Sequence, residues 1–189
     1  MGEAYKSGSR IAALRAERKL SAADLAARSG VNEKELEAIE SGNSSPSIGP
    51  LVKISRVLGV RLGTLLDDAG GEGPVLCEKG HAEEVMRAPG QASPFAGSVS
   101  FFSLAKGKAG RSMEPFIIDV RPGVGAEPPL STHEGEEFIY VLQGEIEVRY
   151  GAETFHVAAG DSIYYDSIVP HRVSSAAPAK AIAVVYAPF

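Results

Sequence analysis

The stretch from His133 to His171 constrains the fold of this chain more than any other. It opens with a His and a Glu four residues apart, His133 and Glu137, at the start of the apolar, β-branched and aromatic run FIYVLQGEIEVRYG. A Gly-Asp turn at Gly160 leads into a second such run, and the stretch closes on Pro170-His171. Runs of this composition are typical of β-strands. Two His and one Glu on neighbouring strands can converge on a divalent metal and leave coordination positions open.

The spacing of these residues resembles the two signature motifs of the cupin superfamily. The first motif has two His one residue apart, then a Glu and a Gly, and here His133, Glu137 and Gly144 keep its intervals. The second motif has an early Gly and a late His, which Gly160 and His171 match. The positions that differ are Ser131 for the first His, Asp166 and Ile168 for a Pro and a Gly, and Ser175 for the final Asn. The resemblance implies a cupin double-stranded β-helix, a small barrel of the jelly-roll kind.

The resemblance also implies a metal site whose ligands are His133, Glu137 and His171. One divalent ion would suit such a ligand set, and the residue types do not distinguish among Fe, Zn, Ni and Mn. An alternative is that the three side chains hydrogen-bond one another, or bind an organic ligand, without a metal. The other two histidines are expected outside the site, His81 at the surface and His156 in a structural role.

Further strands are expected on both sides of this stretch. VSFFSLAKG and MEPFIIDVRPG, from Gly97 on, should form the first strands of the barrel, and PAKAIAVVYAPF should form the last. Because alternate residues of a strand share a face, Ile139 and Val141 should face the lumen if Glu137 does. An eight-stranded barrel is wide enough to hold one small ligand. The aromatic residues expected in the core are Tyr140, Tyr164 and Tyr165.

The chain has 189 residues, which is room for one medium domain or two small ones. Its 44% hydrophobic and 23% charged residues are ordinary for a globular protein. The single cysteine, Cys77, excludes an intrachain disulfide framework and is typical of a reducing compartment. No run approaches 18 apolar residues, and the amino terminus MGEAYKSGSR lacks a hydrophobic signal segment. We therefore expect a cytoplasmic protein without a membrane partner.

Charge and composition divide the chain into two parts. Residues 1–68 hold ten Lys or Arg and nine Asp or Glu, a net charge of +1, whereas residues 69–189 hold nine and fifteen, a net charge of −6. The glycines and the proline between Gly70 and Pro74 cannot continue a helix, which indicates a mobile linker. We expect a helical domain over 9–67, a linker over 68–84 and a barrel over 85–189 that contains the metal-site motifs at 131–175.

The amino-terminal part is predicted to contain five short helices. Ser21 is a good N-cap with Asp24 at the capping-box position, and Asn32 can cap the third helix. The second and third helices are joined by a tight turn and so form a helix-turn-helix, whose second helix usually enters the major groove of DNA. The predicted helices cover the region from Ile11 to Arg18, 22–28, 33–40, the segment between its cap Ser47 and its end at Gly59, and 61–67.

Several short sequence motifs in this region resemble those of the Xre family of phage-repressor-like regulators. Among them are Leu14-Arg15, Leu20-Ser21, Ser29-Gly30-Val31, Ile39-Glu40-Ser41-Gly42 and Leu58-Gly59-Val60. The resemblance implies a five-helix lambda-repressor-like bundle in which Arg15 pairs with Glu40. The positions that we expect to bind DNA are Ser21, Ala22, Arg28, Asn32, Glu33, Lys34, Glu37 and Asn43.

The start of the expected recognition helix is acidic, with the sequence EKELE. Carboxylates close to phosphates are unfavourable, because Lys and Arg that neutralise phosphate charge supply most nonspecific affinity. A carboxylate can still accept a hydrogen bond from cytosine N4 in the major groove. An alternative is therefore that these glutamates solvate a helix whose DNA role has lapsed. The basic side chains that favour a role at the DNA backbone are Arg10, Arg15, Arg18, Lys19 and Arg28.

Three functions agree with these features. The preferred interpretation is a transcriptional regulator and no enzyme: a helix-turn-helix homodimer binds palindromic double-stranded DNA, and the cupin barrel senses a small-molecule effector through a bound divalent metal. The first alternative is a cupin-type mononuclear metal oxygenase or epoxidase resembling phosphonate-processing enzymes of the same two-domain plan. The second is an isomerase-type cupin that modifies a sugar or an amino acid and carries a vestigial helical domain. The helix-turn-helix motifs of the amino-terminal part favour the transcriptional regulator over the two enzymes.

Overall fold

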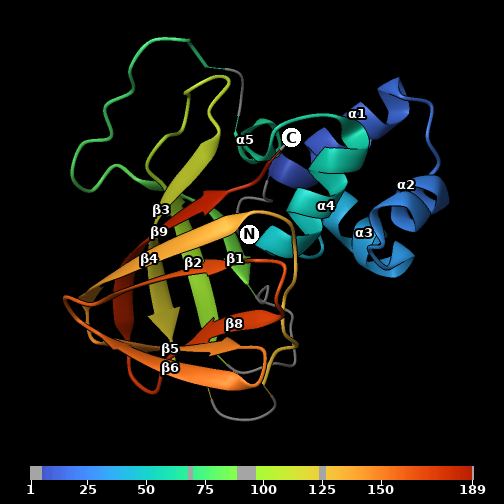
Figure 1. The fold of residues 1–189 in the computed structure, drawn as a ribbon. Helices are drawn as coiled ribbons and strands as arrows, with labels where there is room; N and C mark the ends of the chain where they lie inside the picture. Colours follow the sequence, from blue (N-terminus) through green and yellow to red (C-terminus); the bar gives the residue numbers. More distant parts are fainter. Residues whose placement is uncertain (1–5, 68–69, 89–96, 124–126, 189) are drawn as a thin grey trace.

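The computed structural model describes residues 6–67, 70–88, 97–123 and 127–188 and shows a helical part followed by a β-sandwich (Figure 1). This confirms the expected combination of a helical bundle and a cupin jelly roll. The helices are α1 (Lys6–Glu17), α2 (Ala22–Ser29), α3 (Glu33–Glu40), α4 (Ile48–Leu58) and α5 (Leu62–Leu66). None of the described helices is long and apolar enough to span a lipid bilayer.

Side-chain caps start α2 and α3 where the sequence predicts. The hydroxyl of Ser21 accepts a hydrogen bond from the backbone N–H of Asp24 at 3.0 Å, and the Asp24 carboxylate accepts one from the Ser21 backbone N–H at 3.1 Å, which completes the capping box of α2. Asn32 Oδ1 accepts from two N–H groups in the first turn of α3. Ser47 holds the N-cap position of α4 but makes no side-chain cap hydrogen bond.

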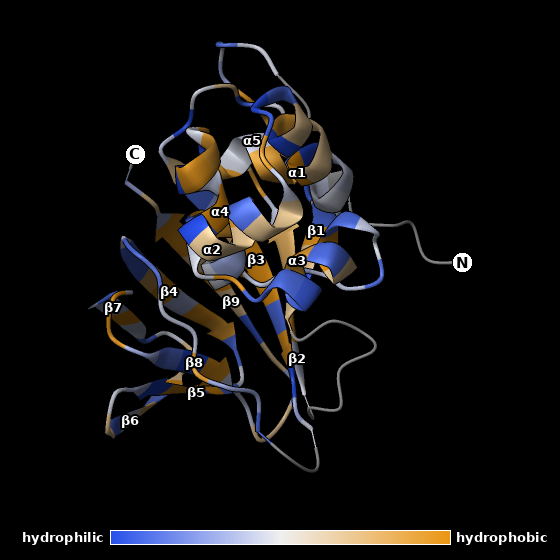
Figure 2. Cartoon of the chain, turned by 90° about the vertical axis from the view of Figure 1, so that its right-hand side faces the viewer, coloured by the Kyte–Doolittle hydropathy of each residue, from blue (hydrophilic) through white to orange (hydrophobic). Residues whose placement is uncertain are grey.

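The helices pack around one apolar stripe from each element. Arg15 and Glu40 join α1 to α3 through two hydrogen bonds of 2.7 Å, from Nε to Oε1 and from Nη2 to Oε2. Figure 2 shows α4 and α5 as largely hydrophobic, whereas α2 and α3 carry more polar positions. Fully buried members of this core are Ile11, Leu25, Leu36, Ile39, Leu51, Ile54, Leu58 and Leu65.

The remaining chain forms two antiparallel sheets that face each other (Figure 1). The larger sheet has the order β1-β2-β3-β9-β4-β7 and the smaller one the order β6-β5-β8. Their strands are β1 (Glu83–Ala88), β2 (Ser98–Ser103), β3 (Met113–Arg121), β4 (Glu136–Gln143), β5 (Glu145–Tyr150), β6 (Glu153–Ala158), β7 (Ser162–Asp166), β8 (His171–Ser174) and β9 (Ala179–Tyr186).

Two expectations about the strands need correction. The first strand, β1, precedes Gly97 and begins inside the segment expected to be linker; it is an edge strand, and its pairing with β2 rather than its own pattern defines it. Of the three tyrosines expected in the core, Tyr165 is buried, but Tyr140 and Tyr164 are 39% and 62% exposed. They lie on the outer face of the larger sheet, because their strand neighbours point inward.

A buried cluster of three charged side chains joins the helical part to the sandwich. Arg111, in the loop before β3, donates from Nη2 to Asp67 Oδ2 and from Nε to Glu114 Oε2, both at 2.7 Å. Each of the three side chains is at most 7% exposed. Gly63 leaves room for the cluster, because a Cβ at this position would lie 2.6 Å from Glu114 Oε1. The junction is therefore a built interface.

The predicted linker also contacts the sandwich. Gly71 forms a parallel bridge with Lys108, and the Ala109 N–H donates to the Gly71 carbonyl at 3.0 Å. Gly70 lies so close to Gly107 that a Cβ would overlap its backbone. Residues 68 and 69 lie outside the described residues. Over 70–71, the segment is held by backbone contacts to the loop before β3.

Candidate metal centre and DNA-binding surface

The three predicted metal ligands meet inside the sandwich. Glu137 is the second residue of β4, and His171 is the first of β8 on the opposite sheet. His133 precedes β4, where its backbone N–H donates to the Ser167 carbonyl at 3.0 Å. Ser131, which stands in place of the family's other His, pairs its backbone with His171 through hydrogen bonds of 2.8 and 2.9 Å. One ligand atom from each of the three residues lies within 4.8 Å of the others.

Backbone carbonyls determine which ring nitrogens face the centre. His133 Nδ1 lies 3.1 Å from the Glu134 carbonyl, and His171 Nδ1 lies 2.8 Å from the Val169 carbonyl. A carbonyl only accepts hydrogen bonds, so each neutral ring must carry its proton on Nδ1. Each Nε2 then presents a lone pair to Glu137 Oε1, at 3.0 Å from His133 and 3.3 Å from His171.

This arrangement fits a metal ion. Three electron-pair donors converge on one buried point, and only a cation or a proton can relieve their repulsion. His133 Nε2 is buried and has no hydrogen-bond partner of acceptable geometry, although Glu137 Oε1 is close. Burial raises the pKa of Glu137, but the two imidazoles, when they carry protons on Nε2, outweigh it and leave the pKa well below its usual range. Burial lowers the pKa of His171, but Glu137 outweighs it and raises that pKa, so a proton on the ring is the alternative to a metal. The residues therefore suit a divalent ion, which would supply a Lewis acid and an anchor for an anionic ligand group.

Two further residues complete the centre and were not identified from the sequence as site residues. The Tyr165 hydroxyl donates to Glu137 Oε2 at 2.7 Å, and the Ser167 hydroxyl donates to Oε1 at 3.3 Å. Tyr165 pairs directly with Glu137 across β7 and β4, so both side chains share the inner face. Burial and the Glu137 charge raise the pKa of Tyr165 well above 10, which keeps it a donor. The available signal was the strand alternation that places Tyr165 inward.

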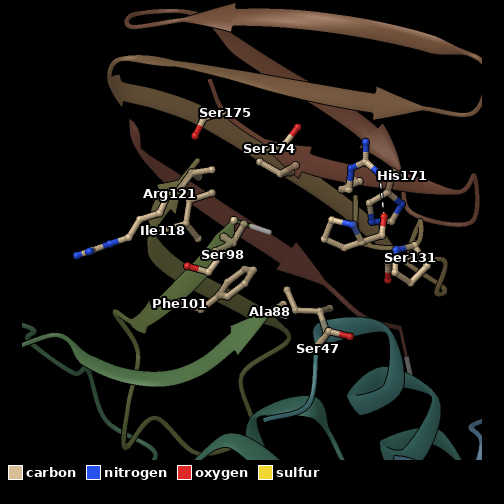
Figure 3. A pocket seen from close by; sticks show the side chains of 18 of the residues that line it. Ser47, Ala88, Ser98, Phe101, Ile118, Arg121, Ser131, His171, Ser174 and Ser175 are labelled. Carbon is tan, nitrogen blue, oxygen red and sulfur yellow. Dashed lines mark hydrogen bonds between the residues drawn. The ribbon is translucent and has the colours of Figure 1, made fainter. Parts of the chain in front are cut away.

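A cavity of about 650 Å³ extends from this centre to the helical part. Its apolar wall comes from the larger sheet, including Phe101 and Ile118, and the segment between α3 and α4 lines its far side. Figure 3 shows Ser131 and His171 at one end of the cavity and Ser47, at the tip of α4, across from Ala88. The helical residues that line it are Glu35, Asn43, Ser44, Ser45, Ser47 and Ile48. A ligand in the cavity would therefore contact both parts of the chain.

The contact between α4 and the metal-site loop is close. A Cβ added to Gly49 would lie 2.6 Å from Ser131 Oγ and 3.9 Å from His133 Cδ2. A second contact is made by the Ser45 hydroxyl, which accepts from the Arg87 backbone N–H at 3.1 Å. The start of α4 and the ligand loop thus form one packed unit.

The residues expected to bind DNA lie on α2, α3 and their flanking turns. All are exposed except the half-buried Ala22. The side-chain oxygens of Ser21 and Asn32 are engaged in helix caps, and Asn43 donates to Ser41 Oγ at 3.0 Å and also lines the cavity. The exposed side chains with no such cap contact are Arg28, Glu33, Lys34 and Glu37.

Family models match both parts of the chain. A helix-turn-helix model matches residues 11–65, and a cupin domain model matches residues 116–185. The solved HTH_3 family transcriptional regulator from Vibrio cholerae has the same fold, with a TM-score of 0.64 at 21% identity over 98% of this chain and 97% of that one. The chain therefore joins an amino-terminal helix-turn-helix domain to a carboxy-terminal cupin domain.

Two curated relatives span nearly the whole chain. The HTH-type transcriptional regulator PuuR of Escherichia coli (strain K12) is 25% identical over 173 residues, which is 92% of this chain and 89% of PuuR. The (S)-2-hydroxypropylphosphonic acid epoxidase of Streptomyces wedmorensis is 27% identical over 181 residues, with 88% of each chain covered. The same two-domain plan thus occurs in a regulator and in an enzyme.

Proposed function

We propose that this protein is a cytoplasmic DNA-binding transcriptional regulator whose cupin domain binds a small-molecule effector next to a divalent metal. The observation that carries the proposal is the cavity that runs from His133, Glu137 and His171 to the turn between α3 and α4. An effector in this cavity touches the segment that follows the recognition helix. The similarity to PuuR supports the same function.

The cavity gives the effector a physical route to the DNA-binding surface. Asn43 lies in the turn that follows α3, Ser47 lies directly before α4, and both line the cavity. An occupant changes DNA affinity only if it binds the DNA-bound and free conformations unequally. The turn between α3 and α4 is the element that would differ between these conformations, because it belongs to both the cavity wall and the helix-turn-helix.

On the DNA side, α3 is the proposed recognition helix. Lys34 provides a cation for phosphate, and Glu33 and Glu37 are exposed carboxylates that can accept from cytosine N4. The amino-terminal part, residues 1–68, has a net charge of only +1 and therefore neutralises few phosphates. Specific binding therefore needs a homodimer that places two recognition helices about one DNA turn, roughly 34 Å, apart.

The proposal is tested by identifying the cavity's occupant and returning it to the DNA complex. Native mass spectrometry of the purified protein, with metal analysis, should show one divalent ion and one small molecule per chain. Adding that molecule should change DNA affinity of the wild-type protein at least fivefold. The variant His171→Ala should keep DNA binding but lose the response. A normal response in this variant would place the effector site elsewhere.

A metal-dependent oxygenase or epoxidase is the second candidate, supported by the relation to the Streptomyces wedmorensis enzyme and by the same His, Glu and His set. The test is oxygen consumption by the Fe(II)-loaded protein with (S)-2-hydroxypropylphosphonic acid. A regulator leaves both oxygen and phosphonate unchanged. Oxygen-dependent turnover of the phosphonate that is lost in His171→Ala would show that the protein is an enzyme and would reject the regulator proposal.

A further inference from the structure

The outer face of the larger sheet carries a continuous apolar surface. In an antiparallel sheet, directly paired residues lie on the same face and successive residues on opposite faces. Phe116, Ile118, Ile139 and Val141 are buried toward the inside, so their strand neighbours point outward. In the middle of the sheet the outward residues are apolar, and the polar ones lie toward the strand ends.

The pairing register arranges these residues in rows. One row runs across four strands through the pairs Phe102 with Ile117, Ile117 with Ile182, and Ile182 with Tyr140. A second row runs from Pro115 through Val184 and Phe138 to Tyr164, and a third pairs Met113 with Tyr186. We call these ten residues the apolar face: Phe102, Met113, Pro115, Ile117, Phe138, Tyr140, Tyr164, Ile182, Val184 and Tyr186.

None of the described helices packs along this face; they pack with one another and meet the sandwich at the cavity, at the Arg111 cluster, and through Arg56 and Arg61, whose side chains contact Glu134 and Ser112. Met113 and Tyr164 are 60% and 62% exposed, and Tyr140 and Tyr186 about 40%. With strands about 4.8 Å apart and rows about 6.8 Å apart, the face covers roughly 400 Å² in projection. Apolar patches of this size on a soluble chain are rare outside interaction sites.

We propose that the apolar face is the homodimer interface, and that its occupant is the same face of a second copy. The area suits this partner: the face supplies about half of the ~800 Å² per partner of a stable dimer, and the residues around it would supply the polar rim. The need for a dimer follows from the proposed DNA binding, but the location of the interface rests on the sheet alone.

The charges at the two ends of the face agree with this pairing. Glu136 and Asp166 pair with each other beside Tyr186 at one end. At the other end lie the exposed Arg121 and Lys180, with Asp119 3.3 Å from Lys180. A two-fold axis in the plane of the interface and perpendicular to the strands brings the acidic end of one copy onto the basic end of the other. The face is thus complementary to itself.

The first test is the mass of the full-length protein in solution, from light scattering and sedimentation equilibrium at micromolar concentration. The wild type should be a dimer. Tyr140→Glu should weaken dimerisation about 100-fold, because it places a charge on the apolar face. Phe155→Glu is the matched control: Phe155 is also an aromatic residue 39% exposed, but it lies on β6 of the smaller sheet and should leave the dimer intact.

A second variant avoids any loss of folding. Cys77 is the only cysteine, so Cys77→Ser with Tyr140→Cys carries one reactive thiol on the face. A short bismaleimide should link two chains of this variant and not of Cys77→Ser with Phe155→Cys. A monomeric wild type, a Tyr140→Glu dimer as tight as the wild type, or equal crosslinking at both positions would overturn the proposal. A dimer through this face that binds no DNA would reject the regulator and leave the interface standing.

Discussion

His133 Nε2 lies 3.0 Å from Glu137 Oε1, and neither atom supplies a proton to the other while His133 is neutral with its proton on Nδ1. A buried contact between two acceptors is unfavourable unless a proton or a metal ion lies between or beside them. The contact between these residues is therefore the main structural reason to expect a metal in this barrel.

Removing one ligand should release the metal. His171→Ala leaves two protein ligands, and metal content measured by mass spectrometry after dialysis should fall from about one ion per chain to near zero. His156→Ala is the control, because His156 is exposed and contacts Glu145 rather than the centre. Metal retained at wild-type content in His171→Ala would show that the three residues form a metal-free cluster.

The hydroxyl of Tyr165 should tune the affinity for the metal. It holds Glu137 Oε2 and so orients Oε1 toward the two rings. Tyr165→Phe removes this hydrogen bond and should weaken metal binding about 10-fold to 100-fold. Tyr164→Phe is a matched control, since its hydroxyl contacts the exposed Glu136 outside the centre. Equal metal affinity in the two variants, measured by competition with a chelator, would remove Tyr165 from the site.

The pair of Arg15 and Glu40 should stabilise the helical bundle. The two side chains are 21% and 11% exposed, so Arg15→Ala leaves a largely desolvated carboxylate. We expect a loss of about 2 kcal/mol in the free energy of unfolding, below the range for fully buried pairs. Arg18 lies just after α1 and is 33% exposed, so Arg18→Ala should change the free energy of unfolding by less than about 0.5 kcal/mol. Similar values for both variants in urea unfolding would contradict this account.

The junction between the two parts should depend on pH. Burial, aided by the Asp67 charge and only partly offset by Arg111, raises the pKa of Glu114 to about 7 from its ordinary value of 4.5. Between these two values the folded chain binds more protons than the unfolded chain, so this contribution to stability is present below pH 4.5 and is lost as the pH rises to about 7. The full loss is about 3 kcal/mol at 1.36 kcal/mol per pKa unit.

The matching measurement is urea unfolding between pH 5 and pH 8. Glu114→Gln should remove the part of the pH dependence that belongs to this carboxyl, whereas Glu83→Gln, at an exposed position, should leave it unchanged. The same slope in Glu114→Gln and wild type would show that Glu114 is already ionised at pH 5.

Most helices were predictable because their signals are local. The capping box of Ser21 and Asp24 and the cap at Asn32 depend on residues three or fewer positions apart. The metal ligands were predictable for a different reason, since their spacing resembles a known motif. The helix caps and the motif spacing can both be recognised without knowing which strands pair.

The features that the sequence did not predict depend on which strands pair or on contacts between residues far apart in the chain. The edge strand β1 has no alternation of its own and exists through its register with β2. Tyr165 becomes a partner of Glu137 only once β7 is placed beside β4. The outward positions of Tyr140 and Tyr164 follow from the same register, and the link between Asp67 and Arg111 joins residues 44 apart in the chain. Composition alone does not specify such contacts.

The central claim, that this two-domain chain is a DNA-binding regulator, is tested most directly by selecting its binding sites. The purified full-length protein is incubated with fragmented genomic DNA, and the retained fragments are sequenced, with Lys34→Glu as the control for α3. We predict one enriched palindromic site with half-site centres about 10 base pairs apart, including DNA near its own gene, and no enrichment with the variant. Fragments retained without any common sequence, or the same sequences retained by wild type and variant, would contradict the account.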